Sequence, residues 1–348
     1  MLNQIRVGVV GLGMGRHHIR QLQANPQATV AAISDIDASR LKLLQKEFQI
    51  PQTFTSAEEM FTKANLDAVV IATPNDTHAV LTIAAFEQDL HVLCEKPMAL
   101  NTRQALQMQV ACEKANKILM INMNYRFRPA SWALKQQIVD GRLGEIYWAH
   151  SVWHRRQGIP LWGEWFYEKS RSGGGPLIDL GVHRLDLALW FMGNPAVQTI
   201  SAATFQKLGP QIAHQAGKNY NVEDLAVAFI RFQNGAVLNL EASWAGYRSE
   251  MEFMQTRLYG TSGGAVHENI AESYNFVTKI YAEESGFFVD KVFRDGPSKV
   301  GNSLDHFVDC VVHNKPPICN GQDGIRLMQI LDGIYQSAER GEELKMQD

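Results

Sequence analysis

The stretch that decides the fold is Ile5-Arg6-Val7-Gly8-Val9-Val10-Gly11-Leu12-Gly13-Met14-Gly15, near the start of a chain of 348 residues. Its first half is a β-branched apolar run, typical of a strand buried on both faces. A helix is expected after the glycines, over 17–24. Backbone N–H groups at such a turn bind anions, and glycine lets a pyrophosphate come close. Gly11, Gly13, Met14 and Gly15 are therefore candidate dinucleotide-binding residues.

The acid after the second predicted strand, 29–34, strengthens this interpretation. Asp35 follows Gly15 by 20 residues. A carboxylate there accepts hydrogen bonds from ribose hydroxyls and repels a 2′-phosphate, which favours NAD over NADP. Arg40 lies nearby and partly offsets that repulsion, so NADP stays open. The alternative for Asp35 is a turn residue or a cap of the predicted helix 37–48. Arg16 occupies the place of the usual last glycine of the fingerprint and is a second candidate for a phosphate contact.

Strand and helix patterns then alternate, which predicts a doubly wound parallel sheet of Rossmann type over 1–124. Further strands are expected at 68–72, 91–94 and 118–121, and further helices at 56–64, 76–88 and 102–115. Residues 125–348 predict an α+β domain with a large, mainly antiparallel open sheet. Its strands are expected at 146–153, 197–205, 224–232, 236–243, 252–259 and 276–281, and its helices at 130–139, 182–191, 303–313 and 324–340. Asn234-Gly235 is a strong hairpin signal.

Composition excludes several classes of protein. Lys plus Arg is 33 and Asp plus Glu is 36, so the chain lacks the basic excess of a protein that binds nucleic acid or anionic membranes. Apolar residues make up 45%, which argues against disorder. The four cysteines form no CxxC pair and suit reduced thiols. With no signal-peptide pattern or long apolar run, a cytoplasmic location is expected.

Two motifs follow predicted strand ends, where open α/β sheets bind ligands. In Glu95-Lys96-Pro97, a partly desolvated Lys96 near a nicotinamide would have its charged form disfavoured and would hydrogen-bond a substrate hydroxyl. The alternative is a surface lysine paired with Glu95. The loop of Thr73, Pro74, Asn75 and His78 is expected against the cofactor, and its alternative is an ordinary turn in which Asn75 or Asp76 caps the next helix.

The most informative stretch is Gly173-Gly174-Gly175-Pro176-Leu177-Ile178-Asp179-Leu180-Gly181-Val182-His183. Asp179 and His183 are four apart and would share one helix face. A carboxylate beside an imidazole suits general acid/base work on a hydroxyl. The alternatives are a capping aspartate with a surface histidine, or a metal pair, for which His150 or His154 would supply the third ligand.

Further candidate substrate contacts lie near these motifs in the sequence. Aromatic and arginine side chains suit a polyol pocket, which makes Arg126, Arg155 and Trp162 candidate substrate contacts, with Arg156 and Trp165 beside them. The alternative is a packed loop with exposed arginines. Cys94 lies beside Glu95-Lys96, so oxidation of its thiol is expected to affect activity.

Together the ordered motifs resemble the glucose–fructose oxidoreductase / inositol dehydrogenase (Gfo/Idh/MocA) family over essentially the whole chain. The resemblance implies an NAD(P)-binding Rossmann domain and a substrate-binding, oligomerising domain. It also implies hydride transfer between a sugar, sugar derivative or inositol carbon and the nicotinamide. Lys96 would lie beside the nicotinamide, Asp179 would hold the substrate hydroxyl and His183 would act as acid/base. A homodimer or homotetramer is expected. An NAD-dependent glycosidase with transient redox, and a non-catalytic NAD-binding sugar sensor, are the alternatives.

Overall fold

The computed structural model describes residues 4–161, 163–294 and 301–346. The chain forms two compact units. The first contains the chain up to Met123 together with residues 301–328, and the second contains the chain from Asn124 to residue 294 together with 329–346. Within the described ranges, no helix is both long and apolar enough to cross a membrane.

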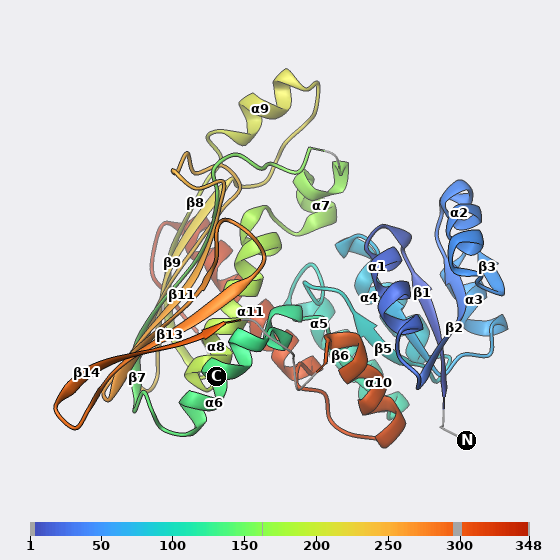
Figure 1. The fold of residues 1–348 in the computed structure, drawn as a ribbon. Coiled ribbons are helices and arrows are strands. Elements are labelled where there is room, and N and C mark those ends of the chain that lie inside the picture. The colour runs from blue at the N-terminus through green and yellow to red at the C-terminus, as the bar shows by residue number, and fades with distance from the viewer. Residues whose placement is uncertain (1–3, 162, 295–300, 347–348) are drawn as a thin grey trace. The chain divides into compact units, whose positions relative to one another are not determined.

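The first unit is built on a six-stranded sheet in which every pair of neighbours is parallel, in the order β3-β2-β1-β4-β5-β6 (Figure 1). The strands are β1 Ile5–Val10, β2 Ala28–Ser34, β3 Gln52–Phe54, β4 Ala68–Ile71, β5 His91–Cys94 and β6 Leu119–Ile121. The helices are α1 Leu12–Gln23, α2 Ala38–Phe48, α3 Ala57–Lys63, α4 Asn75–Phe86, α5 Thr102–Ala115 and α10 Ser303–His313. Such a sheet, with parallel strands joined through helices, confirms the predicted doubly wound architecture.

Helix α1 begins earlier than the sequence predicts. It starts at Leu12 rather than at residue 17 and takes in Gly13 and Gly15. A Cβ on Gly15 would lie 3.0 Å from Val9 Cγ1, so glycine lets the helix pack closely on β1. The glycines are therefore helix residues as well as turn residues. Strand β3, only three residues long, was not predicted.

The second unit is built on a nine-stranded sheet in the order β14-β13-β12-β11-β7-β10-β9-β8-β15. All neighbours are antiparallel except β7 and β10. The strands are β7 Ile146–Arg155, β8 Val197–Phe205, β9 Leu225–Phe232, β10 Val237–Ser243, β11 Glu252–Gly260, β12 Gly263–Asn269, β13 Phe276–Glu284, β14 Phe287–Arg294 and β15 Leu344–Lys345. This sheet confirms the predicted mainly antiparallel second domain.

Helices α6 Pro129–Val139 and α8 Val182–Met192 pack on this sheet (Figure 1). The second unit also contains shorter helical turns, namely a 3-10 turn at Asn124–Phe127, another at Glu164–Tyr167, α7 Lys169–Ser172 and a π-helical turn at Leu177–Gly181. Helix α9 spans Gly209–Gln215, and α11 spans Gly321–Arg340. The predicted hairpin joins β9 and β10, with Gly235 at φ +84°.

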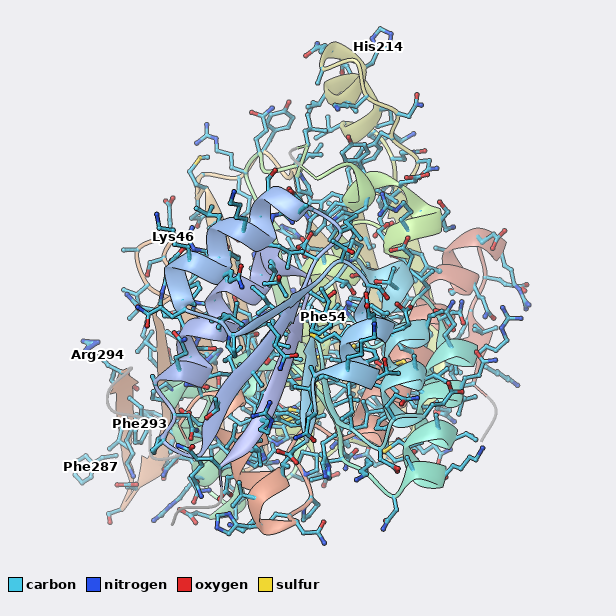
Figure 2. The ribbon with its side chains drawn as sticks, turned by 90° about the vertical axis from the view of Figure 1, so that its right-hand side faces the viewer. Lys46, Phe54, His214, Phe287, Phe293 and Arg294 are labelled. Carbon is cyan, nitrogen blue, oxygen red and sulfur yellow. The ribbon has the colours of Figure 1, made fainter. Side chains whose placement is uncertain are left out.

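Strands β12 and β14 were not predicted. β14 is an edge strand of the nine-stranded sheet and pairs only with β13 among the described strands. Its Phe287 and Phe288 side chains are 72% and 92% exposed. Figure 2 shows Phe287 and Phe293 at the margin of the molecule.

Residues 301–328 belong with the first unit although they lie between the two stretches of chain that form the second unit. Helix α10 contacts α1 and β1. It begins with a capping box of Asn302 and Asp305, and Asn25 donates to Asp305 over 2.8 Å. The Ile121 N–H donates to the Cys319 carbonyl (3.0 Å), which extends the sheet edge beyond β6. Two stretches that are far apart in the sequence therefore form the first unit together.

Candidate functional site

The carboxyl ends of the parallel strands lie side by side in the first unit. Val10 pairs in register with Ser34 on one side and Ile71 on the other, and Ile71 pairs with Cys94. Backbone hydrogen bonds continue past the strand ends, from Gly11 N–H to Ser34 (2.9 Å) and from Glu95 N–H to Ile71 (2.9 Å). The sheet therefore brings the glycine turn, Asp35, the Thr73 loop and the Glu95 loop to one edge, as parallel strands require.

The glycine turn has the geometry of an anion site. Gly11 has φ +82°, and a Cβ there would lie 2.8 Å from the Thr73 backbone nitrogen, so only glycine fits. The N-cap residue Gly11 has no side chain with which to cap α1, and a Cβ on Gly13 would meet open space. Met14 is 57% exposed. The first N–H groups of a helix have no intrahelical partner, so this turn fits the pyrophosphate of a dinucleotide.

Asp35 is buried, and its carboxylate holds the glycine turn through hydrogen bonds. It accepts hydrogen bonds from the N–H groups of Leu12 (2.7 Å) and Asp37 (2.9 Å). Arg40 donates to the same carboxylate over 3.1 Å. A carboxylate has about four acceptor positions, so these contacts leave room for a ribose hydroxyl. Helix α2 is capped by Asp37, not by Asp35.

Arg16 lies on the exposed side of α1. Its guanidinium pairs with Glu47 of α2 over 2.9 Å. A phosphate contact by Arg16 would have to compete with this ion pair.

The Thr73 loop is tied to the Lys96 loop by His78. The imidazole is fully buried, and its ring nitrogens lie 2.9 Å from the Thr73 carbonyl oxygen and 2.8 Å from the Pro97 carbonyl oxygen. Burial lowers the pKa of His78, and the two carbonyl contacts oppose that shift. Pro74, and not Asn75 or Asp76, occupies the N-cap position of α4. His78 thus supports both loops from within.

Glu95 is held by two residues that the sequence did not single out. His18 Nε2 and Asn122 Nδ2 each lie 2.7 Å from its Oε1. Burial opposes ionisation, but these hydrogen bonds and the charge of Lys96 outweigh it, so the pKa of Glu95 lies below its ordinary value. His18 is 97% buried on the inner face of α1, and only the fold shows that this face meets the end of β5. The helix periodicity, which puts His18 in line with Gly15 and Leu22, was the available signal.

Lys96 is half-buried and stands between Glu95 and a cis peptide bond to Pro97. Its backbone N–H donates to Glu95 Oε2 over 3.2 Å. The neighbouring Cys94 is fully buried, and burial raises the pKa of its thiol far above the ordinary value. Burial and the raised pKa argue against the expected sensitivity of Cys94 to oxidation, because the reactive thiolate is disfavoured and inaccessible.

In the second unit, the glycine run is held by a buried carboxylate. Glu223 accepts hydrogen bonds from the N–H groups of Gly175 (2.9 Å) and Leu177 (3.1 Å) and from the Tyr335 hydroxyl (2.9 Å). A Cβ on Gly174 would overlap Tyr335, and one on Gly175 would overlap the Glu223 backbone. Burial raises the pKa of Glu223, against the effect of its donors. The glycines are thus needed for close packing around Glu223, a residue whose role the sequence did not show.

This packing positions the two acid/base candidates. Asp179 lies in the π-helical turn and accepts from Trp244 Nε1 over 3.0 Å. His183 lies in the first turn of α8, where its ring centroid is 4.8 Å from that of Tyr125 and 5.6 Å from that of Trp153. π-helical turns are frequent at functional sites. His183 is buried, so it is not the helix-surface histidine of the alternative interpretation.

Arg155 ends β7 near Asp179. It pairs with Glu252 over 3.2 Å. Burial disfavours its charge, but Asp179 and Glu252 outweigh that effect and raise its pKa. Trp162, the other expected substrate contact in this region, lies outside the described residues.

Arg126 does not have the exposed position expected of a substrate contact. Its side chain is 3% exposed and forks onto Asp186 of α8, with Nη2 2.6 Å from Oδ1. A buried, hydrogen-bonded ion pair of this kind links two segments of the chain. Each charge stabilises the other, because neither is solvated by water.

His150 and His154 belong to a separate cluster on β7. Glu241 of β10 lies between them, 2.8 Å from His150 and 3.4 Å from His154. Within the described part of the chain, no group of three or more histidine, cysteine, aspartate or glutamate side chains has the geometry to hold a metal ion.

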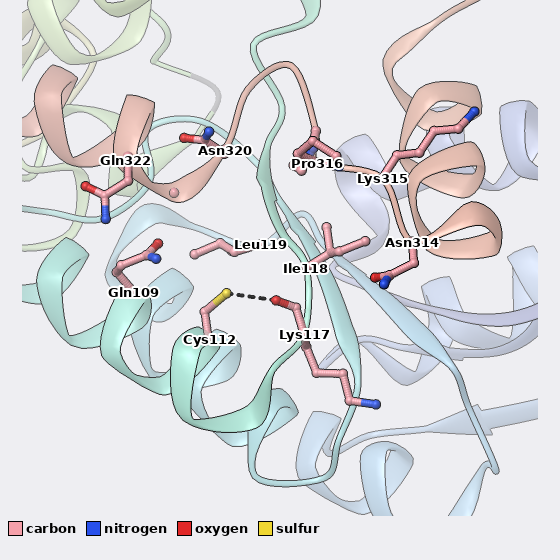
Figure 3. Close-up of a pocket in the computed structure, with 12 residues that line it drawn as sticks. Gln109, Cys112, Lys117, Ile118, Leu119, Asn314, Lys315, Pro316, Asn320 and Gln322 are labelled. Carbon is pink, nitrogen blue, oxygen red and sulfur yellow. Dashed lines mark hydrogen bonds between the residues drawn. The ribbon is translucent and has the colours of Figure 1, made fainter.

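A cavity of about 300 Å³ lies elsewhere in the first unit, beside β6 (Figure 3). Gln109, Cys112, Lys117 and Asn320 are among the residues that line it, and Cys112 donates to the Lys117 carbonyl over 3.1 Å. It contains none of the expected site residues.

Comparison with known proteins supports the same interpretation. The family model described as "Oxidoreductase family, NAD-binding Rossmann fold" matches residues 5–123, and that of the "GFO/IDH/MocA C-terminal domain" matches 132–266. D-glucoside 3-dehydrogenase of Escherichia coli K12 is 31% identical over 98% of this chain and 97% of its own. Myo-inositol 2-dehydrogenase of Thermotoga maritima is 26% identical over 99% of each chain.

Solved structures show the same fold. A levoglucosan dehydrogenase in complex with NADH and levoglucosan superposes with a TM-score of 0.87 at 21% identity, covering 99% of this chain and all of the other. GenD2 from gentamicin A biosynthesis, in complex with NAD, gives a TM-score of 0.83 at 25% identity and covers 100% of this chain and 98% of its own. With the fold, the motifs, both family models and a full-length relative in agreement, the chain belongs to the Gfo/Idh/MocA family of oxidoreductases with an NAD-binding Rossmann fold.

Proposed function

We propose that the protein is an NAD-dependent dehydrogenase that oxidises a ring hydroxyl of a sugar, glycoside or inositol. The observation that carries the proposal is the placement of Asp179 and His183 in successive turns, with the carboxylate held by Trp244 and the imidazole by Tyr125 and Trp153. The names of the relatives support it, because they act on glucosides, inositol and levoglucosan. The first of these makes a glucoside hydroxyl the preferred substrate to test.

The cofactor residues are proposed from the first unit. The turn at Gly11, Gly13, Met14 and Gly15 holds the pyrophosphate, and Asp35 accepts from the adenosine ribose. The loop of Thr73, Pro74 and Asn75 lies against the cofactor, with His78 supporting it from within. When bound, NAD supplies the acceptor for the hydride that leaves the substrate carbon.

The side chains of this protein bind the substrate hydroxyl and accept its proton. His183 accepts the proton of the substrate hydroxyl at a ring nitrogen, which requires the neutral imidazole. Asp179 accepts a hydrogen bond from a substrate hydroxyl and so orients it. Lys96 donates a hydrogen bond to the reacting oxygen and stabilises the negative charge that develops there. Arg155 is proposed as a further donor to substrate hydroxyls.

The test is turnover by the wild type, Lys96→Ala and His183→Ala with a panel of glucosides, free sugars and inositols. Reduction of NAD is followed by absorbance, and NAD binding is measured separately by calorimetry. We expect the wild type to produce NADH in proportion to product. We expect both variants to lose turnover by at least about 10²-fold, the usual contribution of an acid/base group, while they still bind NAD. Activity that survives in either variant would refute its catalytic role.

The same experiment separates the two alternatives. A glycosidase with transient redox would release sugar without net NADH, and a sensor would bind NAD and sugar without either product.

We also propose a homodimer or homotetramer in the cytoplasm. The exposed aromatic side chains on the edge strand β14 support association, since an open edge is normally covered. The free, buried cysteines support a reducing compartment. Light scattering of the purified protein tests the oligomer, and a monomeric mass would contradict it.

A further inference from the structure

Arg184, the residue after His183, is a buried cation. Its side chain is 0% exposed. Among the described residues, none of its three guanidinium nitrogens has a hydrogen-bond partner. A buried charge normally has a partner of opposite charge or several acceptors, because leaving water is costly. Packing alone would be better served here by an apolar side chain, so this arginine calls for a functional explanation.

The guanidinium is held by aromatic rings instead. Its Cζ lies 5.2 Å from the ring centroid of Tyr125 and 5.6 Å from those of Trp153 and Phe276. Tyr125 in turn makes edge-to-face contacts with Trp153 and Phe276, each with centroids 5.5 Å apart. Cations bind to the negative faces of such rings, most strongly when water is excluded. We call Tyr125, Trp153 and Phe276 the aromatic cage.

Two rings of the aromatic cage also contact His183. Tyr125 and Trp153 lie 4.8 and 5.6 Å from the imidazole centroid. Arg184 and His183 therefore share the same two rings. The guanidinium and the imidazole thus pack against the same pair of side chains.

The positive charge itself also acts on this site. Burial lowers the pKa of Arg184 to about 10, so the side chain is still charged at neutral pH. The effect on a histidine is visible at His267 of β12, whose pKa is driven well below its ordinary value by burial and then by the charge of Arg184. A nearby cation disfavours a protonated imidazole, and little water is present here to screen it.

Other charged and titratable groups face the same cluster within the second unit. From β11, Glu252 accepts from Trp153 Nε1 and Arg155. Asp179 lies in the preceding turn, and Tyr274 contacts Trp153 with centroids 6.2 Å apart.

Arg128 also lies over the Tyr125 ring, at 5.9 Å. Two carboxylates, Asp179 and Glu252, and two further arginines, Arg128 and Arg155, thus lie around the aromatic cage. Arg184 is the one of these groups that is fully buried, and therefore the least screened.

We infer that Arg184 is a positioning residue for His183, which holds Tyr125 and Trp153 against the imidazole and, by its buried positive charge, keeps that imidazole neutral and ready to accept a proton. The inference rests on the proposed role of His183 as the base. It gives the unpartnered guanidinium a function that an apolar residue of the same size would not have.

The test compares Arg184→Met, which keeps the length and removes the charge, with Arg184→Lys, which keeps the charge. The pH dependence of kcat/KM is measured for the wild type and both variants. In Arg184→Met, we expect the acidic limb of the pH profile to move to higher pH by about one unit. At a fixed pH below that limb, kcat/KM is then about tenfold lower than in the wild type. The two profiles should converge at alkaline pH. In Arg184→Lys, the limb should stay near the wild-type position.

An unchanged limb in Arg184→Met, or equal shifts in both variants, would overturn the inference. NMR titration of labelled histidine gives a readout that needs no activity: the His183 signal, assigned by its loss in His183→Ala, should titrate at higher pH in Arg184→Met. If Arg184→Met does not fold, Arg184→Gln replaces it with the same expected direction. Full turnover in His183→Ala would instead refute the proposed function, so the two failures are distinguishable.

Discussion

At the scale of single residues, Asp35 connects the glycine turn to the end of the second strand. Its carboxylate already holds the Leu12 N–H and the Arg40 guanidinium. Replacing it by asparagine keeps the shape and removes the charge that attracts ribose hydroxyls and repels a 2′-phosphate. We expect Asp35→Asn to weaken NAD binding by about tenfold or more, because a hydrogen bond to a charged group contributes about 1.5–3 kcal/mol. NADP binding should weaken less.

Initial rates with each cofactor measure this effect. Asp37→Asn is the matched control: it removes a nearby charge while leaving a good N-cap for α2, so cofactor preference should not change. If Asp35→Asn kept the wild-type preference, Asp35 would have no role in choosing the cofactor.

Cys94 provides a second prediction at this scale. Because the thiol is fully buried and its pKa is raised, iodoacetamide at neutral pH should leave Cys94 unmodified in the folded protein. Activity should persist after treatment, and Cys94 should become labelled once urea unfolds the chain. Peptide mass spectrometry reads out both states. Labelling of Cys94 in the folded protein, together with loss of activity, would show that β5 opens.

Single residues also show how far sequence can predict a site. Asp35 follows from its position after a recognisable strand, and Asp179 with His183 from a spacing of four along one segment. Arg126 was expected to face substrate, and its pairing with Asp186 was not foreseen because Asp186 lies 60 residues away in the sequence. His18 was missed for the same reason, since its partner Glu95 is 77 residues away. Local sequence patterns predict which helix or strand a residue lies in and which face of it the residue occupies. Its hydrogen-bond partners from distant segments are known only from the fold.

At the scale of elements, the π-helical turn before α8 depends on Glu223. Glu223→Ala would leave the donors of Gly175, Leu177 and Tyr335 without an acceptor. Each unsatisfied buried group costs about 1–3 kcal/mol, so we expect the free energy of unfolding to fall by about 3 kcal/mol or more. Urea denaturation measures it.

Tyr335→Phe is the matched control for Glu223→Ala. It removes one of these hydrogen bonds and leaves both backbone donors satisfied, so a loss of only about 1 kcal/mol is expected. Equal losses in the two variants would show that the backbone contacts of Glu223 contribute nothing to the turn.

Elements differ in how well the sequence predicts them. β5, α5 and α10 were predicted with the bounds that the structure shows, because their apolar periods and caps are clear. Helix α1 was placed too late because its glycines were assigned to the turn alone. β12 begins with Gly263-Gly264, and β14 alternates between half-buried and exposed residues, so neither carries the apolar signal of a core strand. Their pairing with β13 decides their structure.

At the scale of the whole molecule, the first unit is made from two separate stretches of chain. A fragment of residues 1–124 would lack α10, which contacts α1 and β1, and the strand-like contact of Cys319 with Ile121. We expect this fragment to be unstable, with a broad thermal transition by circular dichroism. Joining 1–124 to 301–328 through a flexible Gly/Ser linker should restore a cooperative transition. A cooperative transition in the short fragment alone would contradict this prediction.

The same arrangement has a consequence for biosynthesis. Translation runs from the N-terminal to the C-terminal side, so strands β1 to β6 are made well before α10, with residues 122–302 in between. The sheet edge at β6 stays open during that time, and open edges favour association with other nascent chains. Completion of the first unit therefore has to wait until the part of the second unit that precedes α10 has been made.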